Sequence, residues 1–350
     1  MRNKYFLILS MFASALGFGQ QYSYVKVDDT YSADRLVKEV LVNSTCDLVS
    51  NVRYQYGSGA PASNGIMAAG YFQRNGSTFP FESGIVLSTD KSSYVPGPKA
   101  TFTPSANQFR WTGDQDLNDL INAAGGWPSV PDARSSIIDF EFIPVQNTIS
   151  FDYIFASNSY YGCTWNCDNG ALFGAWLIDM TTGIGQNLAV IPGTTNTPIS
   201  INTLRDGTKT GMNCAGVSPN SQYFDNAYGG SGNLPALAAP VNYSGITVPM
   251  QSLTANVVVG RKYKIKLAII DFCTNEAHTS GVFFNEGSFD IGNLDLGNPV
   301  LIADGNGLCV GESYTLQSGL DPLLFAFEWF KDGVKIPGAT GATLTVTQTG

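Results

Sequence analysis

The stretch ISFDYIFASNSYYG, residues 149–162, decides the fold of this chain. Its odd-numbered positions from 149 to 155 all carry large apolar side chains, and its even-numbered positions from 150 to 156 form a second, more mixed set. Because successive side chains of a strand point to opposite faces, this period of two predicts a half-buried β-strand. The polar residues 157–161 then predict a loop that carries hydroxyl and amide groups.

Further strands of this kind recur along the chain, at residues 84–89, 136–144, 171–179, 187–193, 261–271 and 281–291. In the segment 261–271, apolar residues alternate with Lys262, Lys264 and Lys266, which predicts an apolar face backed by a solvated one. Two short helices are predicted, over residues 32–42 and 113–126, from apolar residues at helical spacing. Strands separated by Gly- and Asn-rich loops predict an all-β domain, a β-sandwich or jelly roll, over residues 22–297.

After Gly297-Asn298-Pro299 the pattern of the sequence changes. Cys309 falls on an early predicted strand, Trp329 on the next, and Lys331-Asp332-Gly333 reads as a hairpin turn before an alternating strand. This order is typical of an immunoglobulin-like domain. Because the strand that would carry a second cysteine does not follow before Gly350, residues 299–350 are predicted to be the N-terminal part of such a domain in a longer polypeptide.

The composition favours an extracellular β-protein. Charged residues make up 13% of the chain, against roughly 25% in typical soluble domains. Glycine, tyrosine and phenylalanine are abundant, at 38, 16 and 21 residues, as turns and strands require. The net charge of −9 argues against nucleic-acid binding, which needs clustered Lys and Arg. It permits divalent cations.

The N-terminus, residues 1–19, reads as a signal peptide. Arg2 and Lys4 precede an apolar run from Tyr5 to Leu16, and small glycine residues follow it. The run is shorter than the roughly 20 residues that a membrane-spanning helix needs, and no other segment is apolar enough to cross a bilayer. We therefore expect an exported protein, secreted or at the outer cell surface, with no transmembrane segment after cleavage.

Export changes the interpretation of the cysteines. In an oxidising compartment, disulfides are expected from Cys46, Cys163, Cys167, Cys214 and Cys273. Five is an odd number, so one of these stays unpaired within the domain, and Cys309 is expected to stay single for want of its partner. A zinc site would need further Cys or His at close spacing, and His278 is the only histidine, so zinc is not expected.

Carboxylates gather in the segment GDQDLND, as Asp114, Asp116 and Asp119. They could converge on calcium, which takes about six to eight oxygen ligands, and Asp271 at a strand end could add another. Further oxygen donors at loops or strand ends are Asp168, Asn169, Asp225 and Asn226. Helix capping is the alternative, because acids in a first helical turn favour the positive end of the helix dipole. Both interpretations stay open, and no cofactor other than calcium is expected.

A second candidate site is the loop after the deciding strand, which carries Asn158, Tyr160, Tyr161, Trp165 and Asp168. Aromatic faces beside amides and carboxylates are what a sugar-binding or protein-binding loop uses. The alternative is that the rings pack onto the sheet and stabilise the loop. No GxSxG nucleophile motif is present, and strand acids mostly face solvent, so a catalytic site is not expected.

Seven segments together resemble a known family: ESGIVLSTD (82–90), TGDQDLNDLI (112–121), IDFEFIPVQNTISFDYIFASNSYYG (138–162), NLAVIPGTTNTPISIN (187–202), SQYFDN (221–226), YKIKLAIIDF (263–272) and GVFFNEGSF (281–289). Residues 30–295 resemble the choice-of-anchor L domain of secreted bacterial surface proteins. The resemblance implies attachment to cells through varied C-terminal signals. The immunoglobulin-like module resembles those of proteins exported by type IX secretion, which implies that secretion machinery reads a C-terminal signal beyond residue 350.

These observations predict an exported, non-catalytic binding protein that acts in adhesion or binds an extracellular glycan or protein surface. The alternative is an accessory module of a secreted hydrolase whose catalytic domain lies beyond residue 350. The sequence does not identify the ligand.

Overall fold

The computed structural model describes residues 21–44, 48–56, 68–100, 113–124, 133–161, 170–210, 217–272, 279–292, 296, 307–309 and 311–347. The predicted signal peptide, residues 1–19, lies outside these ranges. So do several residues of the predicted sites, namely Cys46, Cys163, Trp165, Cys167, Asp168, Cys214, Cys273 and His278. Within the described ranges, no helix combines the length and the apolar composition that a membrane crossing requires.

The larger sheet, sheet A, has eight strands within the described ranges, all paired antiparallel. Seven of them follow the order β1-β3-β4-β16-β7-β12-β11, and the eighth, β13, also pairs with β7. The strands are β1 (Lys26–Asp28), β3 (Ala69–Gln73), β4 (Ser83–Ser88), β16 (Ser280–Asn285), β7 (Asp152–Ser157), β12 (Gly245–Thr247), β11 (Phe224–Ala227) and β13 (Met250–Gln251).

The smaller sheet, sheet B, has six described strands in the order β10-β8-β15-β5-β2, with β9 paired to β8. They are β10 (Ile199–Ser200), β8 (Ala171–Asp179), β15 (Tyr263–Asp271), β5 (Arg134–Phe142), β2 (Val49–Tyr56) and β9 (Gly185–Asn187). The central strand β15 pairs along its whole length with β8 on one side and β5 on the other. A separate short pair joins β6 (Thr148–Ile149) to β14 (Ala255–Asn256).

The two sheets pack face to face around one large apolar core. Sheet A contributes residues such as Tyr153, Phe155 and Phe284, and sheet B contributes residues such as Phe173 and Leu267. All five are fully buried. The predominance of antiparallel sheet, with few short helices, confirms the predicted all-β sandwich.

The deciding stretch alternates as predicted, but its surroundings differ from the prediction. Its odd-numbered residues from Ile149 to Phe155 belong to the core between the sheets. Ile154 and Ala156 are also buried, in a second apolar cluster on the other face of sheet A, so β7 is covered on both faces. The stretch is also divided into β6 and β7, because the amide of Phe151 donates to Ser252 Oγ (3.0 Å) instead of to a ladder partner.

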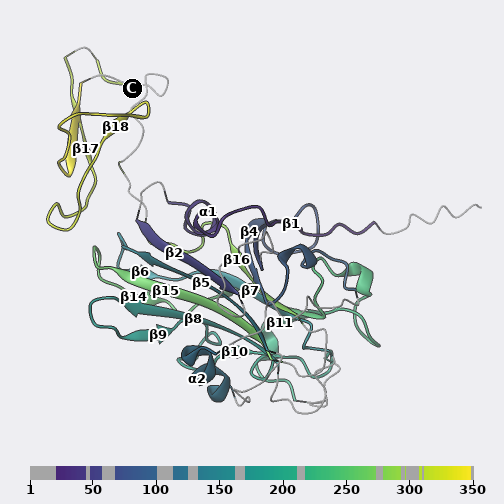
Figure 1. Cartoon of the computed structure of the whole chain (residues 1–350). Helices are drawn as coiled ribbons and strands as arrows, with labels where there is room; N and C mark the ends of the chain where they lie inside the picture. The colour runs from purple at the N-terminus through teal and green to yellow at the C-terminus, as the bar shows by residue number, and fades with distance from the viewer. Residues whose placement is uncertain are drawn as a thin grey trace, which may run out of the picture.

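The helices lie where they are predicted. Ser32 caps α1 (Ala33–Arg35), which continues as the π-helix η1 (Leu36–Val42). The segment 113–126 forms α2 (Gln115–Ala123), whose apolar side chains pack on the outer face of sheet B beside β8 (Figure 1). The predicted solvated face of β15 is covered in part, because α2 packs with Ala268 and Ile270 and its first acids pair with Lys266.

The segment 187–193 is not the strand that its sequence predicts. β9 ends at Asn187, and only an isolated bridge joins Val190 to Pro198. The side chain of Asn187 explains the change, because its Oδ1 accepts from the amides of Ala175 (2.9 Å) and Ala189 (3.1 Å) in place of a strand partner. The predicted strand 281–291 is shorter for a similar local reason: β16 ends at Asn285, and Gly287 turns the chain at φ 65°.

The C-terminal segment forms two short antiparallel pairs within its described residues. β17 (Tyr314–Gln317) pairs with β20 (Thr343–Val346), and β18 (Phe330–Lys331) with β19 (Val334–Lys335). The predicted hairpin turn is confirmed, because Asp332 and Gly333 both take the positive φ (49° and 77°) that a tight hairpin needs. Cys309 is exposed, and its lack of a disulfide partner stays a prediction. The immunoglobulin-like assignment of residues 299–350 stays a prediction.

Tyr153 gives a stability test of the core. Its ring is fully buried, and its hydroxyl has no hydrogen-bond partner in the part of the chain that the structure describes. Removing this hydroxyl in Tyr153→Phe should raise the free energy of unfolding by about 1 kcal/mol, because an unsatisfied buried donor is costly. Tyr160→Phe should have the opposite sign, because the Tyr160 hydroxyl donates to the Leu204 carbonyl (3.0 Å). Urea unfolding of both variants checks this pair, and equal signs would contradict it.

Candidate functional site

The predicted site residues separate into two clusters on opposite faces of β15. Alternate residues of a strand point to opposite faces, so Lys266 faces outward and Asp271 faces the space between the sheets. The Lys266 cluster consists of Lys266, Asp114, Asp116 and Trp176. The Asp271 cluster consists of Asp271, Ser157, Ser159 and Ser280. The four carboxylates considered as calcium ligands are therefore not brought together.

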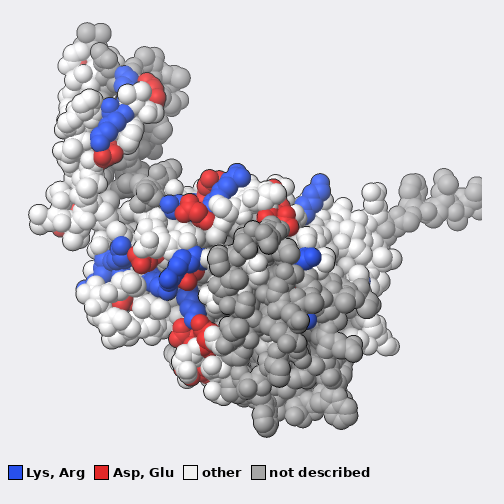
Figure 2. Space-filling model, in the orientation of Figure 1, with Lys and Arg blue, Asp and Glu red and all other residues white. Residues whose placement is uncertain are grey.

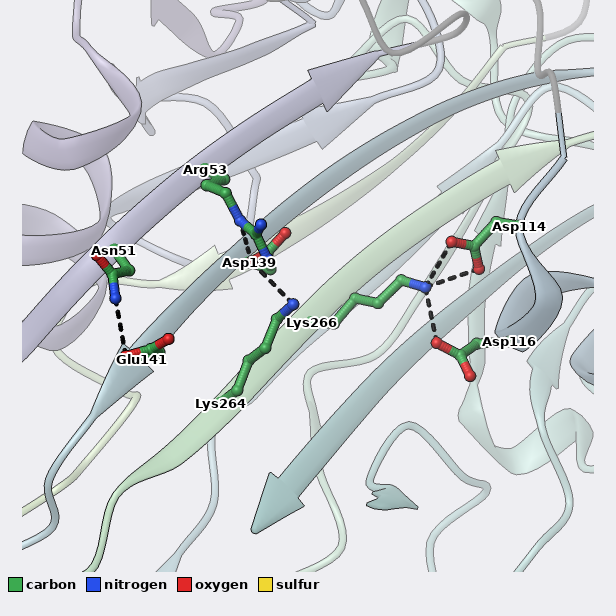
Figure 3. A network of polar contacts seen from close by, with 8 residues as sticks. All are labelled: Asn51, Arg53, Asp114, Asp116, Asp139, Glu141, Lys264 and Lys266. Atoms are coloured by element: carbon green, nitrogen blue, oxygen red, sulfur yellow. Dashed lines mark hydrogen bonds and ion pairs between the residues drawn. The ribbon is translucent and has the colours of Figure 1, made fainter. Parts of the chain in front are cut away.

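The Lys266 cluster is an ion pair with two acids (Figure 3). The ammonium Nζ lies 2.6 and 2.7 Å from the two carboxylate oxygens of Asp114 and 2.8 Å from Asp116 Oδ2. It also lies 5.1 Å from the ring centroid of Trp176, within the range of a cation–π contact. The Lys266 side chain is only 11% exposed, so this charge is neutralised mainly by protein groups.

The acids of this cluster also begin helix α2. Asp114 is its N-cap, and its carboxylate accepts from the amide of Leu117 (3.1 Å). Asp116 follows in the first turn, where a negative charge favours the helix dipole. Asp119 lies one turn further on and accepts from Gln115 Nε2 (2.8 Å). These contacts are those of the capping alternative. The sequence did not identify Lys266 as their partner, because a lysine on an alternating strand reads as solvated.

The donor set at the Lys266 cluster does not fit calcium. Calcium needs about six to eight oxygen ligands, whereas three of the carboxylate oxygens here already contact an ammonium group. Among the described residues, no three His, Cys, Asp or Glu side chains are placed to hold a metal ion.

Calcium dependence is therefore a direct test of these aspartates. We expect the thermal unfolding midpoint of the chain to be the same in millimolar calcium and in excess chelator, because ligand binding to the folded state is what would raise it. Differential scanning calorimetry measures both midpoints. A higher midpoint in calcium that disappears in Asp114→Asn would contradict the capping assignment and restore the metal site.

Two further rows of charge cross the outer face of sheet B (Figure 3). Asp139 on β5 lies between Arg53 (2.8 Å) and Lys264 (3.2 Å) on the neighbouring strands. Glu141 accepts from Asn51 (2.9 Å) and Lys262 (3.2 Å), and the hydrogen bond from Asn51 is the main cause that lowers its pKa. Positive and negative side chains thus lie next to one another on this face, as the space-filling view also shows (Figure 2). Such paired charges offer little attraction to a charged ligand.

The Asp271 cluster joins the two sheets at one end of the sandwich. The carboxylate of Asp271, on sheet B, accepts from Ser159 Oγ (3.0 and 3.1 Å) and from Ser280 Oγ (2.6 Å), on the side of sheet A. Ser157 Oγ lies 2.8 Å from Ser280 Oγ and accepts from the amide of Ser159 (2.9 Å). Asp271 is 4% exposed and the three serines are fully buried. The cluster is a buried polar link.

Asn158 and Tyr160 hold the same loop from inside. Asn158 donates to Asn242 O (3.0 Å) and Thr279 Oγ1 (3.1 Å), and its Oδ1 accepts from Ser244 Oγ (3.0 Å). The ring of Tyr160 is fully buried, which raises its pKa. The predicted ligand contact of these two side chains is therefore corrected: they are interior groups, as the packing alternative states.

Tyr161 is the described residue of the predicted ligand loop that reaches the surface. Its side chain is 49% exposed, although its neighbour Tyr160 is fully buried. Its amide donates to Asn158 O (3.1 Å), so the exposed ring follows directly from a fixed turn. The predicted partners Trp165 and Asp168 lie outside the described residues.

The sequence missed Asp90 and Arg134 at this end of the sandwich. Asp90 is fully buried just after β4, and its Oδ2 lies 3.7 Å from Arg134 Nη1. Burial chiefly raises the pKa of the nearby Tyr243, and the carboxylates of Asp90 and Asp271 raise it further. The sequence does contain a signal for the polar residues at this end of the sandwich. Four of them stand at ends of predicted strands, namely Asp90, Ser157, Asp271 and Ser280.

A family model described as the choice-of-anchor L domain matches residues 25–290 of the chain. The match includes the strands of both sheets, helix α2, and both clusters. No curated protein and no solved structure matches the chain.

Proposed function

The chain belongs to the choice-of-anchor L domain family, and on that premise we propose that its sandwich domain is a non-catalytic binding module that recognises an extracellular glycan or protein in adhesion. The membership indicates a secreted or surface-anchored bacterial protein. The proposal covers both the binding activity of the module and the class of its ligand.

The observation that carries the proposal is the construction of the loop at residues 157–161. Its inner side chains, Asn158 and Tyr160, are tied to the interior by hydrogen bonds, while Tyr161 presents half of its surface to solvent. A rigid loop loses little conformational freedom when it binds, and aromatic side chains contribute strongly to binding. A fixed, exposed ring is what a recognition surface requires.

The pairing of the acids in both clusters supports the absence of catalysis in this module. Asp271 and Asp114 are hydrogen-bonded or paired as structural groups, with Ser280 and Lys266 respectively. A general acid or base must lie within hydrogen-bond reach of its substrate. Asp271, at 4% exposure, does not meet solvent in this arrangement.

The test is a binding panel that also monitors chemistry. The purified chain is applied to immobilised glycans and extracellular proteins, and each ligand is recovered and analysed by mass spectrometry. We expect saturable binding to at least one ligand, which is recovered unchanged. The absence of binding to either class would overturn the proposal. A cleaved ligand would instead favour the hydrolase alternative.

Export and disulfide formation are part of the same proposal. A surface protein in an oxidising compartment would lose residues 1–19 on export, and a type IX route would deliver it. It would also form disulfide bridges among Cys46, Cys163, Cys167, Cys214 and Cys273. Mass mapping of the protein secreted by its own host, without reduction, tests both points. A mature chain that retains Met1, or five free thiols, would reject the corresponding part.

A further inference from the structure

The exposed ring of Tyr161 lies over a glycine of a distant loop. A Cβ placed on Gly230 would lie 2.9 Å from Tyr161 Cε2 and 3.3 Å from its hydroxyl oxygen. Gly230 also takes φ +76°, a conformation that glycine adopts without strain. The ring is therefore supported from beneath by bare backbone, and its remaining surface faces solvent, at 49% exposure.

The loop that supports the ring is held by its own hydrogen bonds. The amide of Gly229 donates to Leu234 O (2.8 Å), and the amide of Leu234 donates to Ala227 O (3.1 Å). Asn233 Nδ2 donates to Gly229 O and to Lys209 O, both at 2.9 Å. These contacts fix residues 227–234 beside Tyr161, so that a ligand would meet a preformed surface.

Polar groups connected to this loop lie on the adjoining strand β11. Lys209 Nζ donates to the backbone carbonyl of Asp225 (3.1 Å) and lies 3.4 Å from Asp206 Oδ2. The Asp225 side chain is half-buried, and burial raises its pKa. The side chain of Asn226 acts on this pKa in the opposite direction. The ammonium of Lys209 is thus held by acceptors from two segments, Asp206 and strand β11.

We propose that the Tyr161 ring, supported by Gly230, forms a binding surface for a neutral pyranose glycan, which stacks on the exposed face of the ring. This inference deepens the proposed function and rests on it. The surface is defined by Tyr161 and Gly230 and is called the Tyr161 platform.

Charge and size select a neutral sugar. The ammonium of Lys209, which contacts the supporting loop, is balanced by Asp206, and the chain carries a net charge of −9, so both features disfavour an anionic glycan. A protein partner would bury about 800 Å² on each side. The exposed apolar side chains at the supporting loop are Tyr161 and Leu234, at 49% and 44%, which suits the face of a sugar ring better than a protein interface.

The test compares three variants of the chain by isothermal titration calorimetry. The probes are cellohexaose, mannohexaose and chitohexaose, with a hyaluronan hexasaccharide as the anionic comparison. Tyr161→Ala should weaken binding of the preferred neutral hexasaccharide about fivefold, because an aromatic stacking contact is worth about 1 kcal/mol. Gly230→Ala should weaken it similarly, because the new Cβ displaces the ring.

Gly232→Ala is the matched control. Gly232 takes φ +83° in the same loop, so its substitution has a similar backbone cost, but a Cβ there meets nothing within 4 Å. Its affinity should stay within about twofold of the wild type. Equal losses in Gly230→Ala and Gly232→Ala, or no loss in Tyr161→Ala, would overturn the platform and leave the proposed function standing. Preference for hyaluronan, or binding of proteins alone in the panel, would overturn the neutral-glycan assignment. If the chain binds no ligand in the panel and none of the hexasaccharides, the proposed function is overturned as well.

Discussion

Asp271→Ala lowers the free energy of unfolding by about 3–5 kcal/mol, the expected cost of leaving buried hydroxyl donors without their charged acceptor. The substitution removes the acceptor of Ser159 Oγ and Ser280 Oγ, which are fully buried. It also removes one direct polar link between the two sheets at this end of the sandwich. Urea unfolding measures the change as a lower midpoint at an unchanged m-value.

Asp152→Ala is the control for Asp271→Ala. Asp152 begins β7, and its carboxylate accepts one long hydrogen bond, from Gln251 Nε2 at 3.5 Å. Its loss should cost less than about 1 kcal/mol. Asp271→Asn should fall between the two, because serine hydroxyls can rotate to donate to the remaining amide oxygen. Equal stabilities of the Asp271→Ala and Asp152→Ala variants would contradict the linking role of the Asp271 cluster.

Phe173→Ala has the second large expected effect, a loss of about 3–5 kcal/mol. Phe173 of β8 is fully buried between the sheets, and its ring lies 5.2 Å from that of Tyr153 and 5.6 Å from that of Phe284 (centroid distances). Truncation removes these contacts and leaves a cavity that rigid sheets cannot close. The measurement is again urea unfolding.

Phe330→Ala serves as the comparison for the core substitution. Phe330 of β18 is 58% exposed, so its truncation should change the free energy of unfolding by less than about 0.5 kcal/mol. A Phe173→Ala variant as stable as Phe330→Ala would mean that the two sheets do not share the core described above.

The sequence predicts the strands well where one local rule governs them. The alternation of residues 149–156 holds in the structure, because each side of β7 meets an apolar layer. The break between β6 and β7 was not predictable, because it depends on Ser252, about a hundred residues away in the chain. The same is true of Lys266, whose burial depends on α2 from a distant segment. The alternation of side chains assigns each residue to one face of a strand, but it does not show which other elements pack on that face.

The candidate site likewise combines features that a local sequence rule predicts with features that depend on distant segments. Capping by Asp114 follows from its position before an apolar periodic segment, and the structure contains it. The contrast between Tyr160 and Tyr161 does not follow from the sequence, because adjacent tyrosines differ only in which one meets Phe224 and which one meets Gly230. The Tyr161 platform is assembled from Tyr161 and Gly230, and their proximity depends on a tertiary contact.

Hydrogen–deuterium exchange with and without a ligand from the binding panel tests the central claim most directly, because it shows where the ligand sits. The account predicts slower exchange, on ligand addition, in peptides that contain Tyr161 and the loop 228–234, with the ligand recovered unchanged. Peptides of the outer face of sheet B, around Lys264, should exchange as before. Protection confined to sheet B, or to the C-terminal segment 311–347, would contradict the assignment of this loop as the binding surface.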